Sequence, residues 1–351
     1  MEISGLGNIN KERKLASVRV IKDIVPHPNA DKLELALVDG WQVVVVKDKH
    51  KKGEKVVYFE IDSLLPCKDC FSFLPASCYT SSSWVPEGYG YRIRTVKLRK
   101  EISQGLVMGL SELFEEDFNP PVGTDLTEIL GVLKWESPIS IYTQGMARGN
   151  FPSFIPKTDQ ERVQNIYKDV VGNASLWEMS LKLDGSSMTA YVKSGEVGVC
   201  SRNLELKLED NADNAFVDAF IRYNLEESLK AFYATTKRSI AIQGELMGPK
   251  IQGNREEFHK NLFFVYDVYD IDRGTYLSQK ERLCIVNNLD LVSVPIIDNI
   301  YLMGMPLEDI LALADRPSLV HPVAEGVVFK NISNPELSFK AISNKYLLLE
   351  K

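Results

Sequence analysis

The stretch "EMSLKLDGSSMTAYV", residues 178–192, decides how the second half of the chain is interpreted. Apolar and polar residues alternate from Met179 to Leu183, which is the period-two pattern of a half-buried strand. The alternation places Lys182 on the polar face, directly before a break in the pattern at Asp184. A lysine at this position is either an ordinary solvated residue or a nucleophile, and the rest of the sequence must decide between the two.

Composition narrows the class of protein. The 351 residues are enough for two domains, and a hydrophobic content of 44% is ordinary for a globular protein. We expect a soluble, intracellular protein of the cytoplasm, with the nucleus left open, because the start carries no apolar signal core and no run is long enough to span a membrane. Five scattered cysteines favour a reducing compartment. A net charge of −7 argues against a protein that coats nucleic acid, but it permits a local basic groove.

The pattern divides the chain into two regions. Residues 1–135 contain short alternating runs such as "ASVRVIKDIV" and "WQVVVV" between turn signals, which predicts a small all-β domain. Residues 136–156 are rich in proline, glycine and serine without periodicity, so we place a linker there. Residues 157–351 mix strands with helices, and capping boxes predict helix starts at Thr158 with Glu161 and at Ser278 with Glu281.

Basic residues cluster in the first region. They lie in "KDKHKKGEK" and "YRIRTVKLRK", where strand alternation would place Arg92 and Arg94 on one face. Such a stripe suits a phosphate backbone, although charge runs are more often solvated surface. The candidate nucleic-acid contacts are Lys47, Lys49, Arg92, Arg94, Lys97, Arg99 and Lys100.

This region has two further features. "VPHPNADKLELALVDG" and "LRKEISQGLVM" resemble the OB-fold module appended to some aminoacyl-tRNA synthetases, which implies an OB fold and nucleic-acid contact. Cys67 and Cys70 form a C-x2-C pair near Cys78, and His50 is the histidine that would have to fold back to complete a zinc site. We interpret the pair as a plain loop.

Short motifs follow Lys182 in a set order. "CSRN" contains Arg202, "QGELMG" contains Glu245, "FFVYDVYD" contains Tyr266, "EGVVFK" contains Glu325, and "SFK" ends at Lys340. The Lys-x-Asp-Gly motif alone is weak. The full series resembles the covalent nucleotidyltransferases, which include polynucleotide ligases and mRNA capping enzymes. The resemblance implies an α+β protein in which an N-terminal all-β OB-fold domain precedes an ATP-grasp-like nucleotidyltransferase domain of antiparallel sheets and helices.

The chemistry of nucleotidyl transfer explains these residue types. A lysine amine attacks the α-phosphorus, and nearby positive charge must lower its pKa from about 10.4. Mg²⁺ or Mn²⁺ would need carboxylates, reached partly through water. We expect Asp184, Glu325 and Asp270 at the metal, Lys340 at the α-phosphate, Arg202 and Glu245 at phosphate and ribose, and Tyr266 or Phe264 against the purine. Each residue has a plainer interpretation as core or solvated surface.

The domain order narrows the resemblance. An OB-like region that precedes the motifs looks like the ATP-dependent RNA ligases of the deinococcal type. This resemblance implies that Arg162 grips the β- and γ-phosphates of ATP, and that nicks with RNA on the 3′-OH side are sealed. Some RNA ligases end the series with Lys-x-Lys, whereas Ser338 stands at the first of these positions here, and whether Lys345 compensates is open.

The expected enzyme forms lysyl-AMP at Lys182, passes AMP to a 5′-phosphate, and joins that end to a 3′-OH. Its expected partners are nicked duplex RNA or RNA–DNA hybrids, with the protein a monomer and no membrane involved. Three alternatives stand beside this hypothesis: an ATP-dependent DNA ligase, a GTP-using capping guanylyltransferase, and an OB-fold RNA-binding protein with a degenerate transferase domain. The last would need a missing lysine or carboxylate, and none is missing.

Overall fold

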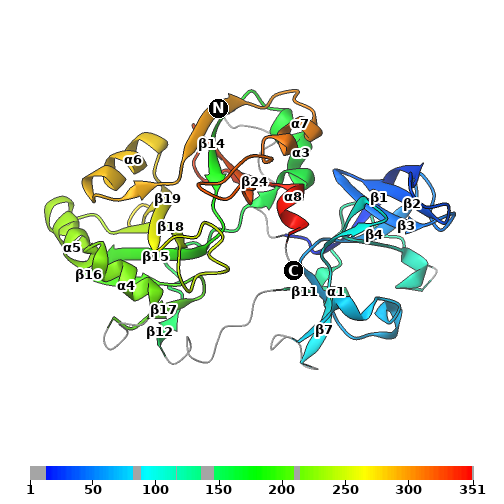
Figure 1. The fold of residues 1–351 in the computed structure, drawn as a ribbon, viewed down its shortest axis with the longest axis horizontal. Coiled ribbons are helices and arrows are strands. Elements are labelled where there is room, and N and C mark those ends of the chain that lie inside the picture. The colour runs from blue at the N-terminus through cyan, green and yellow to red at the C-terminus, as the bar shows by residue number, and fades with distance from the viewer. Residues whose placement is uncertain (1–12, 82–87, 116, 136–145, 209–213, 350–351) are drawn as a thin grey trace. The chain divides into compact units, whose positions relative to one another are not determined.

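The computed structural model describes residues 13–81, 88–115, 117–135, 146–208 and 214–349. The chain divides into two compact units, residues 12–138 and residues 139–349, which are described separately (Figure 1). No helix in the described ranges is both long and apolar enough to cross a membrane.

The first unit is built on a five-stranded antiparallel sheet in the order β10-β4-β1-β2-β3. Its strands are β1 (Ala16–Pro26), β2 (Leu33–Val38), β3 (Trp41–Val46), β4 (Lys55–Phe59) and β10 (Leu106–Gly109). The hairpin of β8 (Thr95–Leu98) and β9 (Glu101–Gln104) lies against β3, where Gln42 donates to the carbonyl of Ile102 at 2.9 Å. The alternating runs of the sequence therefore predicted β1, β3, β4 and β10 correctly.

A smaller sheet completes this unit in the order β11-β5-β7-β6. Its strands are β5 (Ser63–Leu65), β6 (Tyr79–Ser81), β7 (Tyr89–Arg92) and β11 (Leu133–Lys134). Short helical turns lie beside the two sheets: η1 (Asp69–Phe71), η2 (Ala76–Cys78), η3 (Leu110–Glu112) and α1 (Thr127–Leu130). Val18, Val57 and Phe59 are fully buried together with Phe71 and Leu126, so one apolar core lies between the sheets and these turns.

The second unit contains two sheets. The larger follows the order β12-β17-β16-β15-β18-β19-β20, and β21 pairs in parallel with β19. Its strands are β12 (Ala147–Asn150), β15 (Ser186–Lys193), β16 (Glu196–Cys200), β17 (Leu204–Leu206), β18 (Ile240–Met247), β19 (Leu262–Asp270), β20 (Thr275–Tyr276) and β21 (Val292–Ser293). One face is covered by α4 (Ala215–Arg222), α5 (Leu225–Thr236) and α6 (Gln279–Asn288); Figure 1 shows α4 and α5 beside β15 and β16.

The smaller sheet of this unit has the order β13-β24-β23-β14-β22. Its strands are β13 (Glu161–Arg162), β14 (Leu176–Lys182), β22 (Ile296–Tyr301), β23 (Gly326–Asn331) and β24 (Ser338–Ile342), and β13 runs parallel to β24. Helices α3 (Val163–Val171) and α7 (Leu307–Ala312) pack on one face, and α8 (Asn344–Leu347) follows β24. The strand predicted around Lys182 is β14, which lies inside this sheet.

Three predictions of local structure can be compared with these elements. The capping box of Ser278 and Glu281 begins α6 as expected. The box predicted at Thr158 is wrong, because α3 begins at Val163 and Thr158 instead bonds the hydroxyl of Tyr266 at 3.1 Å. The described part of the predicted linker contains β12, which pairs with β17, and residues 136–145 lie outside the described ranges.

Candidate active site

The register of the smaller sheet brings three predicted cations together. Lys182 lies opposite Gly326, and Lys340 lies opposite Val328, two residues further along β23. Arg162 on β13 lies directly opposite Lys340. Residues that oppose each other, or that lie two apart on a strand, share a face of the sheet, so Lys182, Lys340 and Arg162 project from one face. Cations on three different strands thus converge on one place.

Lys182 makes an ion pair with Glu325 across this sheet. Its Nζ lies 2.8 Å from Oε1, and the two side chains are 22% and 17% exposed. Burial lowers the pKa of Lys182, but the carboxylates of Glu325, Glu245 and Asp184 outweigh that effect and raise the pKa above its ordinary value. The amine is therefore protonated in this state, and any nucleophilic role requires these carboxylates to be neutralised first.

The turn after Lys182 depends on glycine. A Cβ at Gly185 would lie 2.4 Å from the carbonyl oxygen of Leu246, so no larger residue fits there. The amide of Gly185 donates to Oε1 of Glu245 at 3.0 Å, which fixes this carboxylate beside the lysine. Burial, followed by repulsion from Glu325, raises the pKa of Glu245 to about 7. The Asp-Gly break in the sequence is thus a turn that connects β14 to β15 and packs against β18.

Arg255 is a site residue that the sequence did not reveal. Its guanidinium lies 3.2 Å from Oδ2 of Asp184 and 3.2 Å from Nδ1 of His321, and it stacks on the ring of Tyr346. The neighbouring Glu256 accepts the amide N–H of His321 at 2.9 Å, which holds the same two loops together. The partners of Arg255 are distant in the sequence, and no local pattern identifies it.

The predicted aromatic residues lie between the two sheets. Phe264 and Tyr266 both contact the apolar cluster around Leu181 and Met247, on the side of β19 opposite the main core. The Tyr266 hydroxyl bonds that of Ser187 at 2.9 Å. Burial raises the pKa of Tyr266, which keeps the hydroxyl protonated.

A buried lysine fixes the strand that carries Tyr266. Lys330 bonds the carbonyl of Tyr266 and pairs with Asp267 at 2.6 Å, with both side chains almost fully buried. Burial lowers the pKa of Lys330. This lysine is the last residue of the "EGVVFK" motif. The motif therefore supplies two residues of the site: Glu325, and the lysine that holds the strand of Tyr266 in place.

Other predicted residues lie at the edges of this region. Arg202 is exposed in the turn after β16, at the end of the sheet where Ser187 and Glu245 oppose each other. Lys340 pairs with Asp159 at 3.3 Å. Lys345 is 66% exposed and pairs with Asp315, beyond the end of β24.

The prediction of Asp270 as a metal ligand is wrong. Asp270 lies opposite Ile240, at the other end of β18 and β19 from Glu245. It is 1% exposed, and Arg238 holds its carboxylate at 2.7 Å. The same strand carries Tyr266, but Asp270 is four positions further along it and therefore lies about 13 Å away. Its charge stabilises the fold and does not belong to the site.

The donor set suits a divalent cation. Asp184, Glu245 and Glu325 all raise the pKa of Lys182, so three carboxylates surround its amine. In the described parts of the chain, no group of three histidine, cysteine or acidic side chains forms a ready-made metal cage. Mg²⁺ commonly keeps several waters and binds carboxylates partly through them, so these three residues fit it.

Some of the predicted basic residues of the first unit bond to other residues of that unit, and the others are exposed. Arg92 stacks on Trp135 at 3.5 Å and pairs with Asp62 at 3.0 Å, so its prediction as a phosphate contact is wrong. The expected shared strand is also wrong, because β7 ends at Arg92 and β8 begins at Thr95. Arg94 donates to the Ser77 carbonyl and Lys49 pairs with Glu112, whereas the exposed predicted residues are Lys47, Lys97, Arg99 and Lys100.

The cysteines of this unit are free thiols. Cys67, Cys70 and Cys78 form no disulfide, and burial raises the pKa of Cys70 and Cys78. His50 faces Glu54 at 3.1 Å.

Comparisons with known proteins agree with both units. Residues 15–110 match a family model described as an OB-fold domain, and residues 176–345 match one described as RNA ligase. No curated protein matches the chain.

Solved structures match nearly the whole chain. A Naegleria gruberi RNA ligase with PPi is 41% identical, with a TM-score of 0.85 over 96% of this chain and 98% of that one. Mutants of that ligase solved with ATP and Mn and with AMP and Mn are also 41% identical, with TM-scores of 0.85 over 95% and 98% of the two chains.

The fold and site thus define an OB-fold domain followed by a covalent nucleotidyltransferase domain. The chain belongs to the RNA ligase family.

Proposed function

We propose that this protein is an ATP-dependent RNA ligase that seals 3′-OH/5′-phosphate nicks through a lysyl-AMP intermediate at Lys182. The observation that carries the proposal is the shared face of Lys182, Lys340 and Arg162, with the carboxylate of Glu325 against the nucleophile. The match to a ligase solved with ATP and Mn supports the choice of nucleotide and metal. Nick sealing, and the link to the deinococcal type, rest on the order of the domains.

The first step forms a phosphorus–nitrogen bond. The Nζ of Lys182 attacks the α-phosphorus of ATP, the bond to the β-phosphate oxygen breaks, and pyrophosphate leaves. Lys340 stabilises the charge on the α-phosphate, and Arg162 lies beside it to hold the leaving phosphates. A bound Mg²⁺ or Mn²⁺, held by Asp184, Glu245 and Glu325 through water, would offset negative charge at the phosphates. These carboxylates then no longer raise the pKa of Lys182.

Two further transfers complete the reaction. The 5′-phosphate of the nick attacks the lysyl-AMP and gives a 5′-5′ pyrophosphate linkage, which releases Lys182. The 3′-OH of the other strand end then attacks that 5′-phosphate, and AMP leaves. All three steps use one pocket, so positioning and charge stabilisation serve each in turn. The exposed cations of the OB-fold unit, among them Lys97 and Arg99, would hold the duplex.

Nucleotide labelling followed by a chase tests this proposal. The purified protein is incubated with α-labelled ATP or GTP and Mg²⁺, separated on a denaturing gel, and chased with nicked duplexes. Label from ATP that moves only into nicks with a ribose 3′-OH supports an RNA ligase. Label from GTP would instead identify a capping-type enzyme, and efficient sealing of deoxyribose 3′-OH ends would identify a DNA ligase.

A charge reversal tests the role of the OB-fold unit. Replacing Lys97 and Arg99 with glutamate should leave ATP labelling unchanged, because neither residue lies in the transferase unit. Sealing should weaken, because the variant repels the phosphate backbone. If sealing keeps its full rate at low duplex concentration, this hairpin does not bind the duplex.

A further inference from the structure

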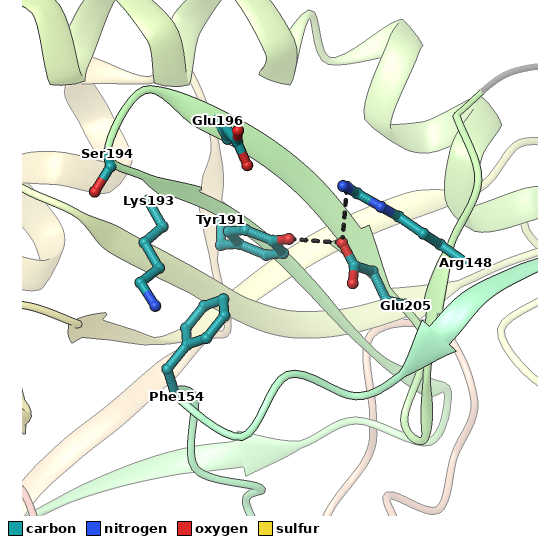
Figure 2. A pocket seen from close by; sticks show the side chains of 7 residues that line it. All are labelled: Arg148, Phe154, Tyr191, Lys193, Ser194, Glu196 and Glu205. Atoms are coloured by element: carbon teal, nitrogen blue, oxygen red, sulfur yellow. Dashed lines mark hydrogen bonds and ion pairs between the residues drawn. The ribbon is translucent and has the colours of Figure 1, made fainter.

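A cavity opens on the larger sheet, toward the end of β15 that lies away from the Lys182 turn. It measures about 460 Å³, which lies in the range of small-ligand pockets. Figure 2 shows the side chains that line it: Arg148, Phe154, Tyr191, Lys193, Ser194, Glu196 and Glu205. They come from β12, β15, β16, β17, the turn between β15 and β16, and the segment that follows β12.

This cavity shares a sheet face with the nucleotide site. Ser187, Tyr191 and Lys193 stand at alternate positions of β15, so their side chains project to the same side. Ser187 is the residue that bonds the Tyr266 hydroxyl. At about 3.3 Å per residue, Lys193 lies about 20 Å along the strand from Ser187. A strand of B-form DNA covers that distance in about six nucleotides at about 3.4 Å each, and the more compact A-form RNA needs about one nucleotide more.

Two aromatic rings form a fixed wall of the cavity. Phe154 meets Tyr191 edge to face, with ring centroids 5.4 Å apart. The Tyr191 hydroxyl donates to Oε1 of Glu205 at 2.6 Å, and burial together with this carboxylate raises the pKa of the phenol. Tyr191 is only 6% exposed, whereas Phe154 is half-buried and offers ring surface to a ligand.

Two of the four charged side chains that line the cavity form an ion pair, and the other two do not form one with any described residue. Arg148 pairs with Glu205 at 3.2 Å, so these two charges offset each other (Figure 2). Lys193 is exposed and stands over the Phe154 ring with its Nζ 3.8 Å from the centroid. Among the described residues, no carboxylate lies within ion-pair distance of Lys193, and no cation pairs with Glu196 on the rim. Lys193 can therefore swing from the ring to an anion without breaking an ion pair.

We propose that this cavity binds one nucleotide of the RNA strand, about six nucleotides from the nick. Its phosphate meets Lys193 and its ribose packs on Phe154, because the sugar and phosphate are the parts of a base-paired strand that face the protein. The inference rests on the proposed function, since it names where that enzyme holds its substrate. The common sheet face and the spacing from Ser187 favour RNA over an acidic peptide, which would need no such alignment.

The two unpaired charges give predictions of opposite sign. Lys193→Gln removes a phosphate contact, so the slope of log affinity against log salt should fall by about 0.7 to 0.9. If wild type and variant bind equally at 1 M salt, the variant should therefore bind about five- to eightfold more weakly than wild type at 0.1 M salt. Glu196→Gln removes a like charge beside the phosphate, so binding should become tighter.

Equilibrium binding to a nicked RNA duplex with a 5′-OH at the nick measures both effects without catalysis. Lys280→Gln is the matched control, because Lys280 is an exposed lysine on α6, on the opposite side of the same sheet. A second measurement places a photoreactive 4-thiouridine at each position from two to ten nucleotides from the nick. Crosslinks to the peptide containing Phe154 should peak near the sixth position. ATP labelling of Lys182 should be equal in all three variants.

The outcomes separate the two proposals. Weaker binding by Lys193→Gln, tighter binding by Glu196→Gln and a crosslink near position six support the RNA site. The proposal is overturned if both variants bind RNA as wild type does, or if both change the affinity in the same direction. It is also overturned if the substitutions alter the binding of acidic peptides and leave RNA binding unchanged. If wild-type protein binds RNA with these charge effects but takes no label from ATP, the proposed function fails and the binding site stands.

Discussion

Removal of Arg282 should strongly destabilise the transferase unit. The Nη2 of Arg282 donates to both carboxylate oxygens of Glu178, at 2.7 and 2.8 Å, and both side chains are 2% exposed. Arg282→Ala leaves the Glu178 charge buried without this partner, which costs about 3–5 kcal/mol. For a unit of this size each kcal/mol lowers Tm by about 2–4 °C, so Tm should fall by about 6–20 °C.

Urea unfolding measures this loss with a built-in reporter. Trp177 is fully buried next to Glu178, so its exposure when the strand that ends at Lys182 unfolds contributes to the fluorescence change of the chain's four tryptophans. The control is the double variant Glu178→Met with Arg282→Met, which removes both charges and should recover most of the stability. A loss below about 1 kcal/mol in Arg282→Ala, or a double variant no more stable than the single one, would refute the reasoning.

Three further predictions concern the site. Gly185→Ala should fail to adopt the native turn and lose ATP labelling, because its Cβ would lie 2.4 Å from the Leu246 carbonyl; normal labelling would contradict this. Glu325→Gln should lower the pKa of Lys182, so that, without metal or nucleotide, an amine-reactive reagent labels Lys182 at lower pH than in wild type. Glu245→Gln should raise Tm above pH 7 and leave it unchanged below about pH 4, since the pKa of this carboxyl is raised to about 7 and its charged form opposes folding. Equal Tm differences at both pH values would count against that account.

Local patterns predicted much of the fold. Period-two alternation located β1, β3, β4, β10 and β14, although burial alternates along β3 alone among them, and β4 and β14 are buried on both sides. The Asp-Gly break after Lys182 was also informative, since only glycine fits against β18 there. The predicted capping box at Thr158 does not form, because the Thr158 hydroxyl is hydrogen-bonded to the hydroxyl of Tyr266.

The site residues that depend on long-range contacts were beyond sequence reasoning. Arg255 contacts Asp184 and His321, which lie far from it in the sequence, and a periodic sequence pattern does not predict such a long-range contact. Arg92 was misassigned for the same reason, because Asp62 and Trp135 engage it across the first unit. Composition alone does not show whether a cation is engaged within the fold or presented to a ligand.

The most direct test of the account is to locate the AMP. The protein is incubated with ATP and Mg²⁺, digested, and the adenylylated peptide is sequenced by mass spectrometry, with Lys182→Ala and Lys182→Arg as controls. The account predicts AMP on Lys182 in the wild-type protein and none in either variant. AMP on another residue, or labelling that survives in both variants, would contradict it.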